Sequence, residues 1–190
     1  MIWVFIIATV AAVAGIAYGV LRKKKPEATG MDIITRWDKD WVPISMIISS
    51  DFSEEEFAKL DAAIKAAASF WNRESGVPGL FAELSRGALV PIMRHDPLTM
   101  DEPSEHACAY ASITVDQTGS LRRAVIYMVD WEHLDSLSLA RVLKHELGHC
   151  LGLAHDEIEY SVMYGKAIKR LYCVSPADKA FLQEVYGNER

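Results

Sequence analysis

The order of the predicted elements indicates an α+β fold, in which long helices cover a mixed, twisted sheet. Two observations carry this prediction: strand and helix patterns alternate in the first half of the domain, and a hairpin pattern precedes two helices in the second half. A third observation is an uncharged N-terminal stretch, which predicts one transmembrane helix before the domain. At 190 residues, 51% of them apolar, the chain is long enough for one domain with a real core.

Residues 1–21 are predicted to be a transmembrane anchor. Residues 2–21 carry no charge and have the length that a helix needs to cross a bilayer. A cleaved signal peptide is the alternative, but its basic residues normally come before the apolar run, and here they follow it. A run this long and uncharged also disfavours a buried core helix.

The basic flank after this run divides the chain and bears on its orientation. Residues 22–37 are predicted to be a juxtamembrane linker, and residues 38–190 the folded domain. Bases on the C-terminal side of a span favour a cytoplasmic location for that side, although an extracytoplasmic domain stays open. We therefore expect a single-pass membrane protein. The four bases are Arg22, Lys23, Lys24 and Lys25.

Beyond the linker the chain is acidic. Without the four bases and Glu27, 16 basic and 25 acidic residues remain, a net charge of −9. Because phosphate binding needs clustered bases, this balance argues against nucleic acid as a partner. Cys108, Cys150 and Cys173 are too few for a disulfide framework, and we expect each to be small, buried and inert.

The first half of the domain predicts a strand, a long helix and two short strands. Residues 42–48 are the first strand, with a proline near its start, where a strand tolerates it. Ser53 and Glu56 form a capping box that begins the helix. Residues 80–84 and 88–93 are the short strands. The helix has an apolar side at helical spacing, formed by Phe57, Leu60, Ile64, Ala67 and Trp71.

The second half predicts a loop, a hairpin and two helices. Residues 94–106 are polar and form the loop, and residues 107–115 and 121–129 flank a five-residue turn. A helix follows from Ser136 to Gly152, and a last one begins at Ser175 with Pro176 in its first turn. The buried sides are Leu139, Val142, Leu143, Leu147 and Leu151 in the former and Phe181, Leu182 and Val185 in the latter.

Residues 145–156 read HELGHCLGLAHD and have the spacing of a metal site. His145 and His149 are four apart, so their imidazoles lie one turn apart on one helix face, as two ligands of one ion require. Glu146 lies about 100° from His145 and about 60° from His149 on a helical wheel. It therefore points to the edge of the site, where a general base would reach a metal-bound water.

A third ligand requires a break in this helix. Unbroken, the helix would carry His155 about 9 Å beyond His149 along its axis. Gly152 supplies the break, because glycine readily adopts the left-handed conformation that ends a helix. Three histidines leave one position for water, which is catalytic zinc coordination, and zinc lowers that water's pKa to about 7. Cys150 is expected to face the core. His95, His106 and His133 lack ligand spacing and are expected to have other roles.

These residues resemble the metzincin metalloproteases, whose motif is HExxHxxGxxH followed by a methionine turn. The turn here is residues 161–164, with Met163 eight residues after His155. The chain is most similar to the catalytic domain of the matrixins, peptidase family M10, in its HELGHCLGLAH segment, its S-x-M-Y turn and its final S-P-x-D helix. The resemblance covers about residues 38–190.

The resemblance implies a zincin-like fold and a zinc-dependent endopeptidase with one catalytic Zn²⁺. His145, His149 and His155 would hold the metal, Glu146 would be the general base, and Met163 would have a structural role beneath the site, as Gly152 has in the turn. A protein or peptide substrate would lie antiparallel to an edge strand at residues 107–114, and we expect a monomer. The implied substrate contacts are Ala107, Ala109, Tyr110, Ala111 and Tyr164.

Some residues depart from the family pattern. Gly165 stands where matrixins often have proline, and Asp156 where they more often have serine. A structural calcium or a second zinc has no ligands that the pattern assigns. Two alternatives stay open: a metal-stabilised peptide-binding module without turnover, and a non-proteolytic zinc amidase. The retained Glu146 and the three histidines speak against the first, whereas the motif does not specify the acyl group.

Overall fold

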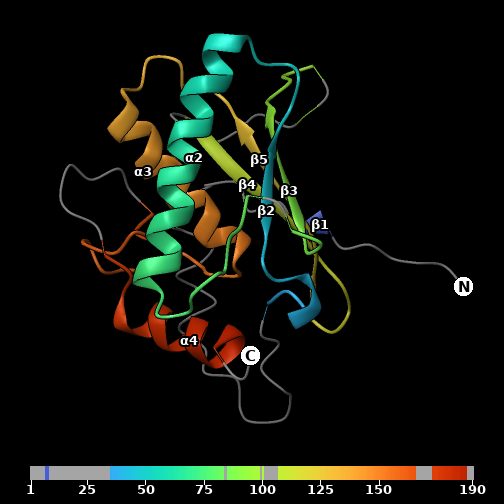
Figure 1. Ribbon diagram of the computed structural model, residues 1–190, viewed down its shortest axis with the longest axis vertical. Helices are drawn as coiled ribbons and strands as arrows, with labels where there is room; N and C mark the ends of the chain where they lie inside the picture. The colour runs from blue at the N-terminus through green and yellow to red at the C-terminus, as the bar shows by residue number, and fades with distance from the viewer. Residues whose placement is uncertain are drawn as a thin grey trace, which may run out of the picture.

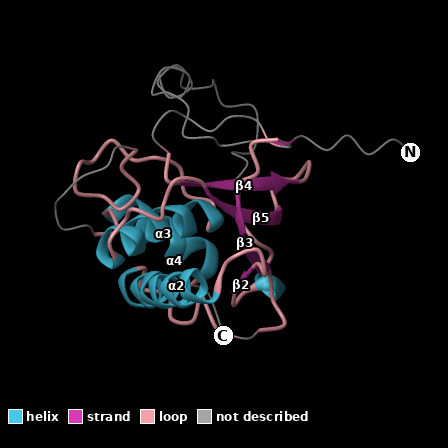
Figure 2. Cartoon of the chain, turned by 90° about the horizontal axis from the view of Figure 1, so that it is seen from above, coloured by secondary structure: helices cyan, strands magenta, loops and turns pink. Residues whose placement is uncertain are grey.

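A computed structural model of the chain describes residues 7–8, 35–83, 85–98, 100, 107–165 and 173–187. In this part, helices α2 (Glu54–Glu74), α3 (Ser136–Cys150) and α4 (Pro176–Tyr186) all lie on one side of a five-stranded sheet, as Figures 1 and 2 show from two directions. A short 3-10 helix, η1 (Lys39–Trp41), precedes the strands of the domain. The α+β class is confirmed.

The sheet is mixed, as predicted, with the strand order β1-β4-β5-β3-β2. β2 (Ser45–Ile48), β3 (Leu89–Arg94) and β5 (Leu121–Met128) run parallel to one another. β4 (Ala109–Val115) runs antiparallel to β5, so the predicted hairpin is present. Because the strands of this hairpin pack beneath α3, they bring the β4 backbone close to the end of the motif helix.

The strand predicted at residues 80–84 is wrong. Within the described residues 80–83, only Phe81 makes a bridge, to Ile44. The side chain of Asn72 takes the place of a neighbouring strand. Its Oδ1 accepts from the backbone N–H of Phe81 at 2.9 Å and its Nδ2 donates to the Phe81 carbonyl at 2.9 Å. These two bonds satisfy the Phe81 backbone without a ladder.

Helix α2 begins at the predicted capping box. Ser53 Oγ accepts from the N–H of Glu56, and Glu56 Oε2 accepts from the N–H of Ser53 at 2.7 Å. Leu60 and Trp71 are fully buried, as expected. Phe57 is 46% exposed, so its assignment to the buried side is wrong. It lies about 60° round the helix from Leu60, at the edge of the apolar face and in the first turn.

An ion pair between Arg94 and Glu56 joins the end of β3 to the start of α2, and it makes the stability of the fold depend on pH. Arg94 Nη2 donates to Glu56 Oε1 at 2.6 Å, and this bond, with that from the Ser53 backbone, lowers the Glu56 pKa to about 2. A lowered carboxyl pKa stabilises the fold above the unfolded value of about 4.3, and that stabilisation is lost as pH falls toward 2. We therefore expect the free energy of unfolding of Glu56→Gln, measured by urea titration, to fall less between pH 5 and pH 2 than that of the parent.

The matched control is Glu54→Gln, which changes a carboxylate in the same turn but outside the capping box. It should keep the pH dependence of the parent over this range. Equal slopes of unfolding free energy against pH for the parent and Glu56→Gln would contradict the assignment.

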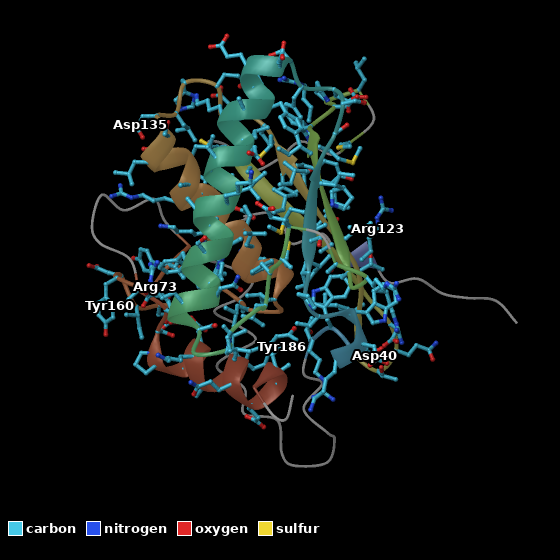
Figure 3. All side chains as sticks on the ribbon, viewed as in Figure 1. Asp40, Arg73, Arg123, Asp135, Tyr160 and Tyr186 are labelled. Atoms are coloured by element: carbon cyan, nitrogen blue, oxygen red, sulfur yellow. The ribbon has the colours of Figure 1, made fainter. Side chains whose placement is uncertain are left out.

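Three side chains tie the C-terminal end of α3 to the rest of the domain. Trp37 Nε1 donates to the Cys150 carbonyl at 2.7 Å, and Trp71 Nε1 donates to the Lys144 carbonyl at 2.8 Å. The hydroxyl of Tyr186, which Figure 3 labels beside α4, donates to the Leu151 carbonyl at 3.1 Å. These bonds come from the segment before η1, from α2 and from α4, so they hold this end of the helix rigidly. Trp37, at the end of the predicted linker, is itself buried.

The predicted membrane anchor lies almost wholly outside the described residues. Only Ile7 and Ala8 of that segment are described, and they form β1, an antiparallel strand beside Thr114 and Ile113 of β4. At these two positions the structure is a strand and not the expected helix. Among the helices in the described part of the chain, none combines the length and apolarity that spanning a bilayer requires.

Candidate metal centre

Helix α3 carries two of the predicted ligands and has a well-defined start. Asp135 caps its exposed N-terminal end (Figure 3), where Oδ1 accepts from the N–H of Ser138 at 2.7 Å. Leu139, Leu143 and Leu147 are fully buried on the predicted face. This packing sets the rotation of the helix, so His145 and His149 face the same side, toward the turn that follows.

The helix ends through Gly152, as the sequence predicts. Gly152 has a φ of 90°, its N–H donates to the His149 carbonyl at 2.9 Å, and the N–H of Leu153 donates to the Gly148 carbonyl at 3.1 Å. This is the Schellman pattern of helix ends. A Cβ at residue 152 would lie 2.0 Å from the backbone oxygen of Thr35. Glycine is therefore required both by its φ and by the close approach of another segment.

The three predicted ligands converge after this turn. His149 Nε2 lies 3.2 Å from the Nε2 of His145 and 3.2 Å from that of His155, and the remaining Nε2 pair is 3.1 Å apart. Tetrahedral zinc with Zn–N bonds of 2.0–2.1 Å places two nitrogens about 3.3–3.4 Å apart. The triangle thus has the size that one zinc ion needs.

The second nitrogens show which tautomers are present. His145 Nδ1 lies 2.8 Å from the Val162 carbonyl, and His149 Nδ1 lies 2.9 Å from the Leu153 carbonyl. A carbonyl oxygen only accepts, so each Nδ1 carries the hydrogen and each Nε2 presents a lone pair. Burial lowers the pKa of both rings, that of His145 to about 4, which favours the neutral forms. Lone pairs that face one another at this distance repel each other, and a cation bound between them would remove that repulsion.

Glu146 lies beside the triad and under β4. It is 7% exposed, and burial raises its pKa to about 8, against a hydrogen bond from the Ala111 backbone that lowers the pKa. A divalent cation held by the three histidines would oppose this shift and favour the carboxylate. The carboxyl group of Glu146, one residue after the first histidine, thus contacts the backbone of the predicted substrate strand.

Met163 lies in the core beneath the site. It is fully buried, and a Cβ at Gly148 would lie 2.2 Å from its Sδ, so this side chain packs directly on α3 next to His149. The turn around it is held by the Asp156 N–H, which donates to the Met163 carbonyl at 2.8 Å, and by the Met163 N–H, which donates to Ser161 Oγ at 3.0 Å. This turn also presents the Val162 carbonyl to His145.

The predicted substrate strand is partly an edge. Ala109, Tyr110 and Ala111 lie in β4, and β1 pairs only with Ile113 and Thr114. In the described part of the chain, no strand pairs with residues 109–112 on the side away from β5. All three named side chains are buried, so this segment can offer a peptide its backbone but little side-chain surface. Ala107 precedes the strand, and Tyr164 follows Met163; both are half-buried.

The other histidines and the cysteines take no part in the triad. His95 Nδ1 lies 3.1 Å from the Tyr110 hydroxyl, His133 pairs with Asp130, and His106 lies outside the described residues. All three cysteines are unbridged. Cys150 is buried and faces the core, as expected, whereas Cys108 is half-buried and Cys173 exposed, so the expectation of burial is wrong for these two. Exposure of Cys173 follows from its place beside the surface turn at Tyr160.

Several residues that support the site carry no sequence signal. The carbonyl groups of Val162 and Leu153 orient two ligands, yet every residue has such a group. Trp37 supports the end of α3 through its bond to Cys150, although the two residues are 113 positions apart in the sequence. Only a long-range contact could have revealed these roles.

A comparison with protein families matches the matrixin model, Peptidase_M10, over residues 36–187. The chain belongs to the matrixin family. The matched range includes the three histidines, Glu146 and Met163, and the matrixins are a family of metalloproteases. A comparison with curated proteins finds no significant match. In the described part of the matrixin, the histidine triad is the one group of three or more His, Cys, Asp or Glu side chains that could hold a metal ion.

Proposed function

We propose that this matrixin is a zinc-dependent endopeptidase that hydrolyses peptide bonds, with Glu146 as its general base. The observation that carries the proposal is the convergence of three Nε2 atoms beside a buried carboxyl group that also contacts the β4 backbone. A structural zinc site fills all four coordination positions with protein ligands. The triad supplies three nitrogens and leaves one position open, which is the arrangement of a catalytic site.

The three histidines and Glu146 would have different roles in peptide hydrolysis. His145, His149 and His155 would hold zinc, which when bound lowers the pKa of a water and polarises the substrate carbonyl. Glu146 would be the general base: its carboxylate would accept the proton of the attacking water and pass it to the leaving amide nitrogen. Its burial among apolar neighbours keeps bulk water away from the transferred proton.

The outer side of β4 at residues 109–112 would bind the substrate. An extended peptide can add to a strand edge through backbone hydrogen bonds, which select for an unfolded segment and not for a particular side chain. The Ala111 backbone contacts Glu146, so a peptide paired at this position would pass directly over the general base. We propose that the enzyme acts as a monomer, since this edge, the base and all three ligands come from one chain.

The test is a cleavage screen of casein and a peptide library by the purified full-length protein in detergent. We expect cleavage with zinc, loss of cleavage with 1,10-phenanthroline, and recovery when zinc is restored. Zinc-loaded protein that binds peptides without cutting them would favour the binding module instead. Turnover of small or cell-wall amides, with no cleavage of proteins, would favour the amidase.

We further propose that residues 1–21 anchor the enzyme in a membrane, with the catalytic domain on the cytoplasmic side. The uncharged run and the basic flank after it support this proposal. In intact cells, a C-terminal epitope tag should resist externally added protease and become sensitive after permeabilisation. Digestion of the tag in intact cells would place the domain outside.

A further inference from the structure

The third ligand differs from the other two in how it is held. His145 and His149 stand on α3, and each ring is oriented by a bond from Nδ1 to a backbone carbonyl. His155 lies on the turn after the helix, and its Nδ1 makes no hydrogen bond to any of the described residues. Histidines that bind metals almost always use their second nitrogen for such a bond, which fixes the orientation of the ring.

The surroundings of His155 also leave it room. A surface pocket of about 400 Å³ opens beside the ring, and its lining includes the apolar side chains of Leu153, Ile158 and Phe181 together with Asp156 and Asp178. The ring is only half-buried, whereas His149 is 5% exposed. Within the described residues, no hydrogen bond from Nδ1 opposes a rotation of the His155 side chain toward this pocket.

A glycine also lies close to the His155 ring. A Cβ at Gly165 would lie 3.1 Å from Nδ1, 3.3 Å from Cγ and 3.5 Å from Cε1 of His155. Distances this similar to three adjacent ring atoms place that Cβ over the flat face of the imidazole and not in its plane. Because residue 165 is glycine, it places no side chain against this face.

We propose that zinc enters and leaves through rotation of His155, and that Gly165 is a positioning residue whose missing side chain leaves this ring able to turn. The inference rests on zinc as the metal of the triad but not on peptide cleavage. A methyl group at residue 165 would contact the ring face, and the ring can adjust by a few tenths of an ångström because the pocket lies beside it. The same contact would then hinder rotation.

The first experiment leaves the sequence unchanged. NMR spectra of the zinc-loaded full-length protein with ¹⁵N-labelled histidine should show slowly exchanging Nδ1 protons for His145 and His149. The Nδ1 proton of His155 should exchange with water too fast to be observed. Protection of His155 equal to that of the other two ligands would overturn the proposal.

The second experiment measures zinc release to a chromogenic chelator in excess. Gly165→Ala should slow the release about tenfold, the lower end of the effects that groups around ligands have on metal affinity. Tyr160→Phe is the control, because Tyr160 projects outward from the same segment (Figure 3) and should leave the rate unchanged. Release from Gly165→Ala that is as fast as from the parent, or faster, would overturn the role of Gly165. Both readouts are independent of protease activity.

Discussion

Glu146→Gln should abolish peptide cleavage while the protein keeps its zinc. Glutamine has the shape of glutamate and can still contact the Ala111 backbone, but it cannot accept the proton of the attacking water. General acid–base catalysis contributes about 10²–10⁴-fold to rate, so we expect kcat/KM to fall by at least about a hundredfold. Zinc content by atomic absorption should stay at the level of the parent, because none of the three ligands is changed.

The matched control for this variant is Glu157→Gln. Glu157 is an exposed residue near the third ligand, and its substitution removes the same charge without touching the site. Its cleavage rate should equal that of the parent. Cleavage by Glu146→Gln at the parental rate would show that another group is the base, whereas loss of zinc would show that the variant had damaged the triad.

Gly152→Ala should weaken both the fold and the metal site. Alanine at a φ of 90° is strained, and its Cβ would lie 2.0 Å from the Thr35 oxygen, so the backbone has to move. Strain of this kind costs about 1–3 kcal/mol, or several degrees of melting temperature in a domain of this size. Because the turn carries His155 back to the other ligands, we also expect zinc affinity to fall by at least about tenfold. Calorimetry and competition with a chelator would measure the two effects.

Gly119→Ala separates backbone strain from the effect on the metal. Gly119 has a φ of 84° in the turn between β4 and β5, so alanine there meets a similar conformational cost away from the triad. This variant should lose stability and keep its zinc affinity. If Gly152→Ala bound zinc as tightly as the parent, the turn would not be needed to position His155.

The predictions that succeeded depend on residues close together in sequence. The capping box at Ser53, the hairpin around residues 116–120 and the glycine that ends α3 are each set by a few adjacent side chains. The strand expected at residues 80–84 failed because a distant amide, Asn72, satisfies the backbone there. The prediction that Phe57 is buried was wrong for a related reason. The burial of a residue at the edge of an apolar face depends on the partner that packs there.

For this protein, the sequence alone predicted most of the elements of the domain, the three histidines that converge and the need for Gly152, since helical spacing and glycine geometry are local properties. Tertiary structure decided how the ligands are held. The tautomers of His145 and His149 depend on the Val162 and Leu153 carbonyls, and the pKa of Glu146 depends on burial beneath β4. Every residue has a backbone carbonyl, and burial results from packing. A sequence pattern therefore predicts neither the tautomers of these histidines nor the pKa of Glu146. The room around His155 has the same origin, because it depends on which segments of the fold approach the ring and which do not.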